Sequence, residues 1–80
     1  MDPALSKYRE TVATNVRVAR AYHMLNQGDV VTRMHALGFT YWHRQTVGQV
    51  ERGKRRLYVE ELYGLAQALE TSVARLLGVR

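Results

Sequence analysis

Apolar residues recur every three or four positions along nearly the whole chain, and no segment alternates strictly between apolar and polar residues. This spacing collects apolar side chains on one face of an α-helix, whereas strict alternation would indicate a β-strand. The sequence therefore predicts an all-α fold. A chain of 80 residues has the size of one small domain with one modest core. Such a core leaves little room for a buried catalytic cavity.

Two predicted helices fill the first half of the chain. The first is expected to run from residue 3 to about residue 25, because Asp2 is a suitable cap and an apolar stripe follows it. Residues 1–14 are either part of this extended first helix or an extension appended to the core. Asn26 is a favourable cap for the second helix, and Gly38 is the left-handed residue that commonly ends one.

The third predicted helix begins near Arg44 and carries the polar side chains that are the main candidates for contact with a partner. Trp42 lies just before its cap and Val47 at its fourth position, which is the spacing of a hydrophobic staple. Gly53 is the expected end of this helix. The side opposite Val47 is polar, so this helix should present a hydrogen-bonding outer face.

Two further helices complete an expected five-helix bundle. Apolar residues at helical spacing between residues 59 and 69 predict the fourth, with Glu60 and Glu61 near its positive end. Ser72 is a suitable cap for a short fifth helix, which Gly78 would end.

The net charge of the chain resides in one segment. The segment between residues 33 and 56 contains six basic residues and one acidic residue, Glu51, so its net charge is +5. This equals the formal net charge of the whole chain. A basic patch of this kind is typical of proteins that bind a polyanion, although a solvated charge run would look the same. We expect Glu51 to form a structural ion pair, with a neighbouring helix or with Arg17 or Arg20.

Several function classes lack the residues they need. The chain contains no cysteine and three histidines without metal-ligand spacing. No nucleophile, base and orienting acid can be singled out, so we expect no enzymatic activity, no cofactor and no metal. No apolar run approaches the roughly 20 residues that span a bilayer, and the first residues lack the order of a signal peptide. We therefore expect a cytoplasmic location and no membrane partner.

Three stretches carry a family resemblance: "NQGDVVTRM", "RQTVGQVERGKRR" and "VEELYGLAQALETSVARLL". They resemble consecutive segments of the lambda-repressor-like (Cro-type, XRE family) helix-turn-helix DNA-binding domain. The resemblance covers roughly Val16 to Leu77. It implies that residues 1–80 form a single compact five-helix domain of this kind, whose third helix lies in the DNA major groove.

The resemblance also assigns contacts. Base contacts would come from three side chains of the third helix, namely Arg44, Gln45 and Gln49. Arginine can pair with guanine and glutamine with adenine, although exposed glutamines are also ordinary helix formers. Contacts to the DNA backbone would come from Gln27, His43, Thr46, Arg52, Lys54, Arg55 and Arg56, and such contacts give affinity without sequence choice.

Two features depart from the family pattern. The connection "HALGFTYWH" before the third helix is several residues longer than the usual tight turn. His43 also stands where a serine or threonine normally caps the reading helix, and Thr40 is an alternative cap upstream. With the longer connection, Tyr41 and His43 could themselves contact the DNA backbone.

The expected function is that of a bacterial or phage-type transcriptional regulator, a repressor that occupies a promoter. Its partner would be a near-palindromic operator in duplex DNA, bound by a homodimer that pairs through the first half of the first helix or through Leu76 and Leu77. We expect no small-molecule effector and no further domain after Leu77. Two alternatives are an antitoxin or adaptor that uses the same fold to bind protein, and a non-specific nucleic-acid binder.

Overall fold

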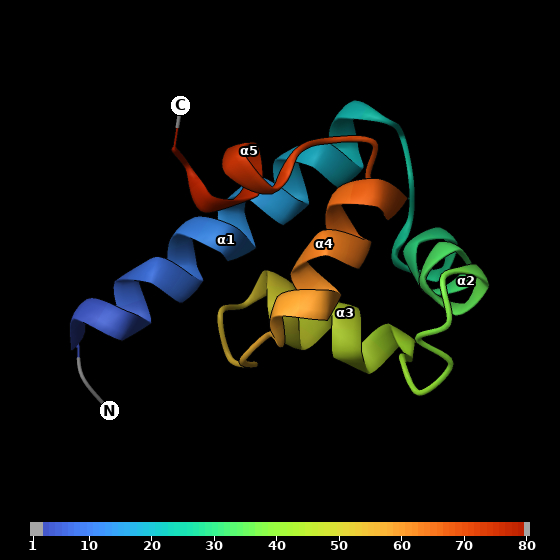
Figure 1. Cartoon of the computed structure of the whole chain (residues 1–80), viewed down its shortest axis with the longest axis horizontal. Helices are drawn as coiled ribbons and strands as arrows, with labels where there is room; N and C mark the ends of the chain where they lie inside the picture. Colours follow the sequence, from blue (N-terminus) through green and yellow to red (C-terminus); the bar gives the residue numbers. More distant parts are fainter. Residues whose placement is uncertain (1–2, 80) are drawn as a thin grey trace.

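The computed structural model describes residues 3–79, with side chains from residue 5 onward, and this part of the chain contains five α-helices and no strand (Figure 1). The all-α prediction is confirmed. The predicted cap Asp2 lies outside the described residues. The helices are α1 (Pro3–Tyr22), α2 (Gln27–Ala36), α3 (Arg44–Glu51), α4 (Val59–Ala68) and α5 (Val73–Leu77).

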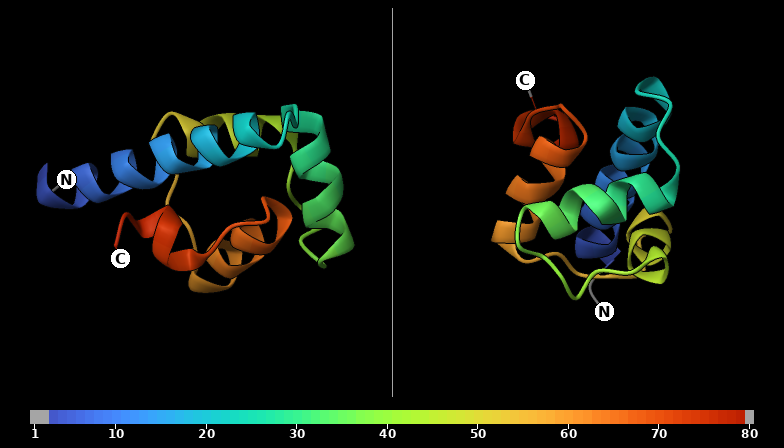
Figure 2. Two further views of the ribbon diagram at one scale, coloured as in Figure 1. Left: turned by 90° about the horizontal axis from the view of Figure 1, so that it is seen from above. Right: turned by 90° about the vertical axis from the view of Figure 1, so that its right-hand side faces the viewer.

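The longest helix, α1, spans the molecule. Its 20 residues correspond to about 30 Å at the rise of an α-helix, and the molecule measures 33 × 25 × 20 Å. Helices α3 and α5 pack against it, while α2 and α4 pack against each other. The first turns of α1 extend past the other helices (Figure 2). Residues 3–14 are therefore the beginning of α1 itself.

Each of the five helices of the described chain ends in the same hydrogen-bonded turn, with one residue in the left-handed conformation, which is Gly78 after α5. Gly38 and Gly53 occupy this position after α2 and α3, as predicted, with φ of 101° and 68°. After α1 the position is taken by Met24, with φ of 57°, and the Leu25 amide donates to the Arg20 carbonyl at 3.0 Å. The first helix therefore ends at Tyr22, which corrects the predicted end near residue 25.

The core lies where α2, α3, α4 and α5 meet the second half of α1. Trp42 is its largest fully buried side chain, and it packs with Val47 in one cluster, as the staple predicts. The other buried members are Val16, Val30, Met34, Val50, Leu65, Ala66, Ala68, Leu69 and Leu76.

Some apolar residues with helical spacing are exposed. In α1 these include Leu5 and Tyr8 in the first turns, which extend past the other helices, and Tyr22 at the last residue. At and after the start of α4, Tyr58, Val59 and Tyr63 are also on the surface. The spacing of these residues predicts a helix correctly, but it does not predict which residues of the apolar stripe are buried against another helix.

Candidate nucleic-acid interface

Helix α3 has two chemically distinct faces. Val47 and Val50 are buried in the core. On the other side, Gln45, Gln49 and Arg52 follow one another at intervals of four and three residues and are all exposed. Residues so spaced share one face of an α-helix. The outer face of α3 is therefore polar and carries donors and acceptors that are open to a partner.

The beginning of α3 is held without a serine or threonine cap. The His43 amide donates to Thr46 Oγ1 at 3.1 Å, so the hydroxyl of the third helical residue reaches back over the helix start. Because His43 is the residue before the helix, the alternative cap Thr40 is wrong. His43 itself is exposed, as is Arg44, whose guanidinium lies across the first turn of α2, beside Gly28.

The long connection before α3 is folded against the core. The Phe39 amide donates to the Met34 carbonyl at 3.0 Å, which closes the end of α2. The Phe39 ring lies on Gly64 of α4, where a Cβ would come within 2.5 Å of the ring. A ring nitrogen of His35 lies 2.7 Å from the Trp42 carbonyl. The additional residues therefore follow a defined path from α2 to α3.

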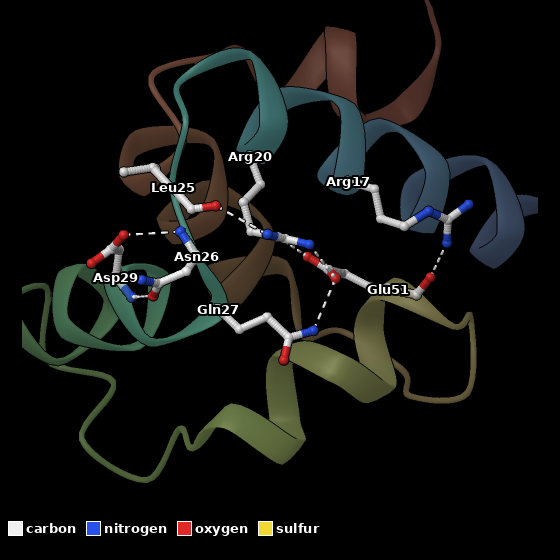
Figure 3. A network of polar contacts seen from close by, with 7 residues as sticks. All are labelled: Arg17, Arg20, Leu25, Asn26, Gln27, Asp29 and Glu51. Carbon is white, nitrogen blue, oxygen red and sulfur yellow. Dashed lines mark hydrogen bonds and ion pairs between the residues drawn. The ribbon is translucent and has the colours of Figure 1, made fainter.

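The C-terminal end of α3 is anchored through the buried carboxylate of Glu51 (Figure 3). Arg20 of α1 donates to it twice, from Nε at 2.5 Å and from Nη2 at 3.1 Å, and this contact raises the pKa of Arg20. Gln27 of α2 donates to the same carboxylate at 3.1 Å, and Arg17 donates to the Glu51 carbonyl. The expected ion pair of Glu51 is confirmed, with Arg20 as its side-chain partner.

A second buried carboxylate, that of Glu61 in α4, accepts hydrogen bonds from the segments on both sides of α3. Before α3, Tyr41 Oη and Trp42 Nε1 donate to it at 2.7 and 3.0 Å. After α3, Arg55 donates from Nη1 and Nη2 at 2.9 and 3.0 Å. The Tyr58 amide completes the set at 2.9 Å.

These contacts keep Glu61 ionised. Burial by itself raises the pKa of a carboxyl group, but the hydrogen bonds from Arg55 and the other three donors outweigh it and lower the pKa of Glu61 from 4.5 to about 2. The same hydrogen bonds raise the pKa of Arg55 and of the Tyr41 hydroxyl. The Arg55 guanidinium also lies over the Trp42 ring, 5.3 Å from its centroid.

The structure divides the ten predicted site residues into two groups. Seven are exposed: His43, Arg44, Gln45, Gln49, Arg52, Lys54 and Arg56. The other three make internal contacts. Gln27 donates to Glu51, the Thr46 hydroxyl caps α3, and Arg55 is bound to Glu61. The phosphate contact expected of Arg55 fits this geometry poorly, because its guanidinium is committed to a buried partner.

The charge of this surface differs from the local charge count. Arg33, which counts towards the basic segment in the sequence, donates to the Ala68 carbonyl at 2.8 Å and to Glu70 at 3.2 Å. Glu51 is buried, so it puts no negative charge on the outer face of α3. The exposed cations of α3 and the segment after it are Arg44, Arg52, Lys54 and Arg56.

The role of Glu61 is the main feature that the sequence does not indicate. Its position in the first turn of α4 predicts a contact with the helix dipole and with nearby amides, and the Tyr58 contact is of this kind. The contacts with Tyr41 and Trp42 bridge 20 and 19 positions of the chain. A local pattern has no way of predicting them.

Within the described residues, no group of three or more His, Asp or Glu side chains is placed to hold a metal ion, and no helix has both the length and the apolar character needed to cross a bilayer. No protein-family model, curated protein or solved structure matches the chain. The arrangement around α3 is therefore interpreted from its own chemistry.

Proposed function

We propose that this chain is a sequence-specific duplex DNA-binding protein with a lambda-repressor-like arrangement, in which α2 and α3 form the helix-turn-helix motif and α3 enters the major groove. The observation that carries the proposal is the outer face of α3, which presents Gln45, Gln49 and Arg52 at helical spacing. A major groove about 12 Å wide admits one α-helix, and glutamine side chains such as Gln45 and Gln49 can pair with base edges. In this role the protein acts as a transcriptional repressor of bacterial or phage type.

Affinity and specificity come from different residues in this proposal. Arg44, Gln45 and Gln49 contact bases, while Arg52, Lys54 and Arg56 neutralise phosphates. Phosphate contacts release counterions from any sequence, whereas a good pair with a base edge discriminates by about 1–3 kcal/mol. The burial of Glu51 supports this division, because no carboxylate of α3 faces the DNA.

We further propose that the operator is near-palindromic and is bound by a homodimer. The first helix and the C-terminal residues, which are separate candidates for the dimer contact in the sequence, form one surface. Asn15 of α1 donates to the Leu76 carbonyl at 3.1 Å, and Tyr8 and Leu77 line one groove of about 180 Å³. Tyr8 and Leu77 are exposed at this groove, and Leu5 is exposed beside Tyr8 in a second groove, as expected of a face that a second copy covers.

The test is selection from a pool of randomised DNA duplexes at near-physiological salt, with sequencing of what the protein retains. An enriched inverted repeat with half-sites about one helical turn apart is the expected result. Retention without enrichment would instead favour a non-specific nucleic-acid binder. No retention would favour an antitoxin or adaptor that binds protein.

Two matched variants distinguish contacts to bases from contacts to phosphates. We expect Gln49→Ala to relax the preference at one base position, at a cost of about 1–3 kcal/mol, and Lys54→Ala to weaken all duplexes alike and reduce the salt slope by about 1. Both residues are exposed, so neither change should unfold the protein. An equal loss on all sequences from both variants would contradict the proposal.

The dimer contact has its own test. Replacing Leu5 and Tyr8 together by serine should leave binding to a single half-site intact and abolish the cooperative gain on the inverted repeat. Sedimentation of the wild type and the variant would show whether the pair dissociates. Undiminished cooperativity on the inverted repeat would place the contact elsewhere.

A further inference from the structure

Both ends of α3 are tied to a single buried side chain. Tyr41 and Trp42, which precede α3, and Arg55, which follows it, all donate to the carboxylate of Glu61. Glu61 is 0% exposed and belongs to α4, which makes none of the proposed DNA contacts. Its position makes it a fixed point outside α3 that both flanking segments share.

We propose that Glu61 and Tyr41 are positioning residues for base reading: through the Tyr41–Glu61 hydrogen bond, the long connection holds the start of α3 in register with the bases. The inference rests on the proposed function. It assigns the additional residues of the connection a role in sequence preference.

The position of Tyr41 along the chain supports this role. Tyr41 lies three residues before Arg44, so a change in its position is passed directly to the first turn of the helix that presents Arg44 and Gln45. Hydrogen bonds weaken steeply outside a narrow range of distance and angle. A small displacement of this turn therefore weakens contacts to base edges, while contacts to phosphates tolerate it better.

The two ends of α3 are also held in different ways. Glu51 fixes the C-terminal end of the helix to α1 and α2 through Arg20 and Gln27. At the N-terminal end, the staple and the Thr46 cap act within the helix and its adjoining residues. At this end His35 of α2 also contacts the Trp42 carbonyl, and the Tyr41 and Trp42 side chains join the segment to α4 through Glu61. Of the two, the bond from Trp42 is buried, whereas the bond from Tyr41 is part-buried and the Tyr41 residue is 52% exposed.

This exposure makes a clean experiment possible. Tyr41→Phe removes the hydroxyl that donates to Glu61 and leaves Trp42, Arg55 and the rest of the core in place. Tyr58→Phe is the matched control, because Tyr58 is also exposed and contacts the same carboxylate through its backbone amide. The control loses a surface hydroxyl without losing a bond to Glu61.

The measurement is the ratio of affinities for the selected operator and for a duplex of scrambled sequence, at a temperature where circular dichroism shows each variant to be folded. For Tyr41→Phe we expect the ratio to fall by about three- to tenfold, as the loss of one hydrogen bond to a charged group allows. Affinity for the scrambled duplex and its salt dependence should not change. Tyr58→Phe should retain the wild-type ratio.

Three results would overturn the inference. The first is a wild-type ratio in Tyr41→Phe, and the second is an equal loss of ratio in Tyr58→Phe. The third is a parallel loss of affinity for both duplexes with a reduced salt slope, which would mean that Tyr41 contacts phosphate directly. If the wild-type protein itself prefers no sequence, the proposed function fails and the inference fails with it. A preference that survives Tyr41→Phe would refute only the inference.

Discussion

The buried carboxylate of Glu61 makes a large and measurable contribution to stability. Its pKa falls from 4.5 to about 2 in the folded protein. Lowering a pKa by 1 corresponds to about 1.4 kcal/mol, so ionised Glu61 stabilises the fold by about 3 kcal/mol at neutral pH. Breaking a buried ion pair from one side costs about 3–5 kcal/mol. We therefore predict that Glu61→Gln, which leaves Arg55 without its carboxylate partner, destabilises the protein by about 3 kcal/mol.

The pH dependence of this contribution has a definite sign. Because the folded-state pKa of Glu61 is depressed, the stabilisation is fully present above the unfolded value of 4.5 and is lost as the pH falls towards 2. The wild-type protein should therefore lose stability across this interval. Glu61→Gln has no carboxyl group to protonate at this position, so its stability curve should be flatter over the same interval.

Urea unfolding followed by circular dichroism, repeated between pH 2 and pH 7, measures both effects. The matched control is Glu60→Gln, since Glu60 is the preceding residue of α4 and is exposed. A domain of this size has a total stability of roughly 4–12 kcal/mol, so the loss in Glu61→Gln should be obvious. A loss below about 1 kcal/mol, or an acid-induced decline as steep as in the wild type, would refute this account of Glu61.

Three further substitutions test separate features of the fold and the interface. Met24→Gly should raise the melting temperature by several degrees, because Met24 has a φ of 57°, a conformation that costs a residue other than glycine about 1 kcal/mol or more. A lower melting temperature would contradict this. Gly64→Ala should destabilise the protein by about 1–3 kcal/mol in urea unfolding, since the new Cβ would lie 2.5 Å from the Phe39 ring. In Gly28→Ala the new Cβ would lie 2.7 Å from the present position of the flexible Arg44 guanidinium and would displace it. The variant should therefore bind the operator more weakly in a mobility-shift assay, with a melting temperature that is unchanged or higher.

The helix ends show how far local pattern predicts this fold. Where glycine takes the left-handed position, as at Gly38 and Gly53, the predicted helix end is confirmed. Where Met24 or Glu70 takes it, the sequence carries no such signal, because a residue other than glycine adopts this conformation only when the surrounding structure, here the hydrogen bonds from Leu25 to Arg20 and from Thr71 to Ala66, imposes it. The predicted end of the first helix is wrong for this reason.

The site shows the same limit at longer range. The exposed face of α3 follows from the spacing of Gln45, Gln49 and Arg52, since the helical repeat alone decides which side chains share a face. The partners of Arg55 do not follow from any spacing. Its neighbours along the chain are basic, and its bond to Glu61 depends on how the segment after α3 turns back onto α4.

This difference matters for the interpretation of charge. In the sequence, Arg55 counts towards the basic segment and Glu51 counts against it, but the fold removes both from the surface of α3 by pairing them with Glu61 and Arg20. The formal charge of the segment is therefore a poor measure of the phosphate contacts that we propose for it, because a cation paired with a buried carboxylate is not available to replace the counterions of DNA. The salt dependence of binding should therefore report the exposed cations of α3 and the segment after it, without Arg55.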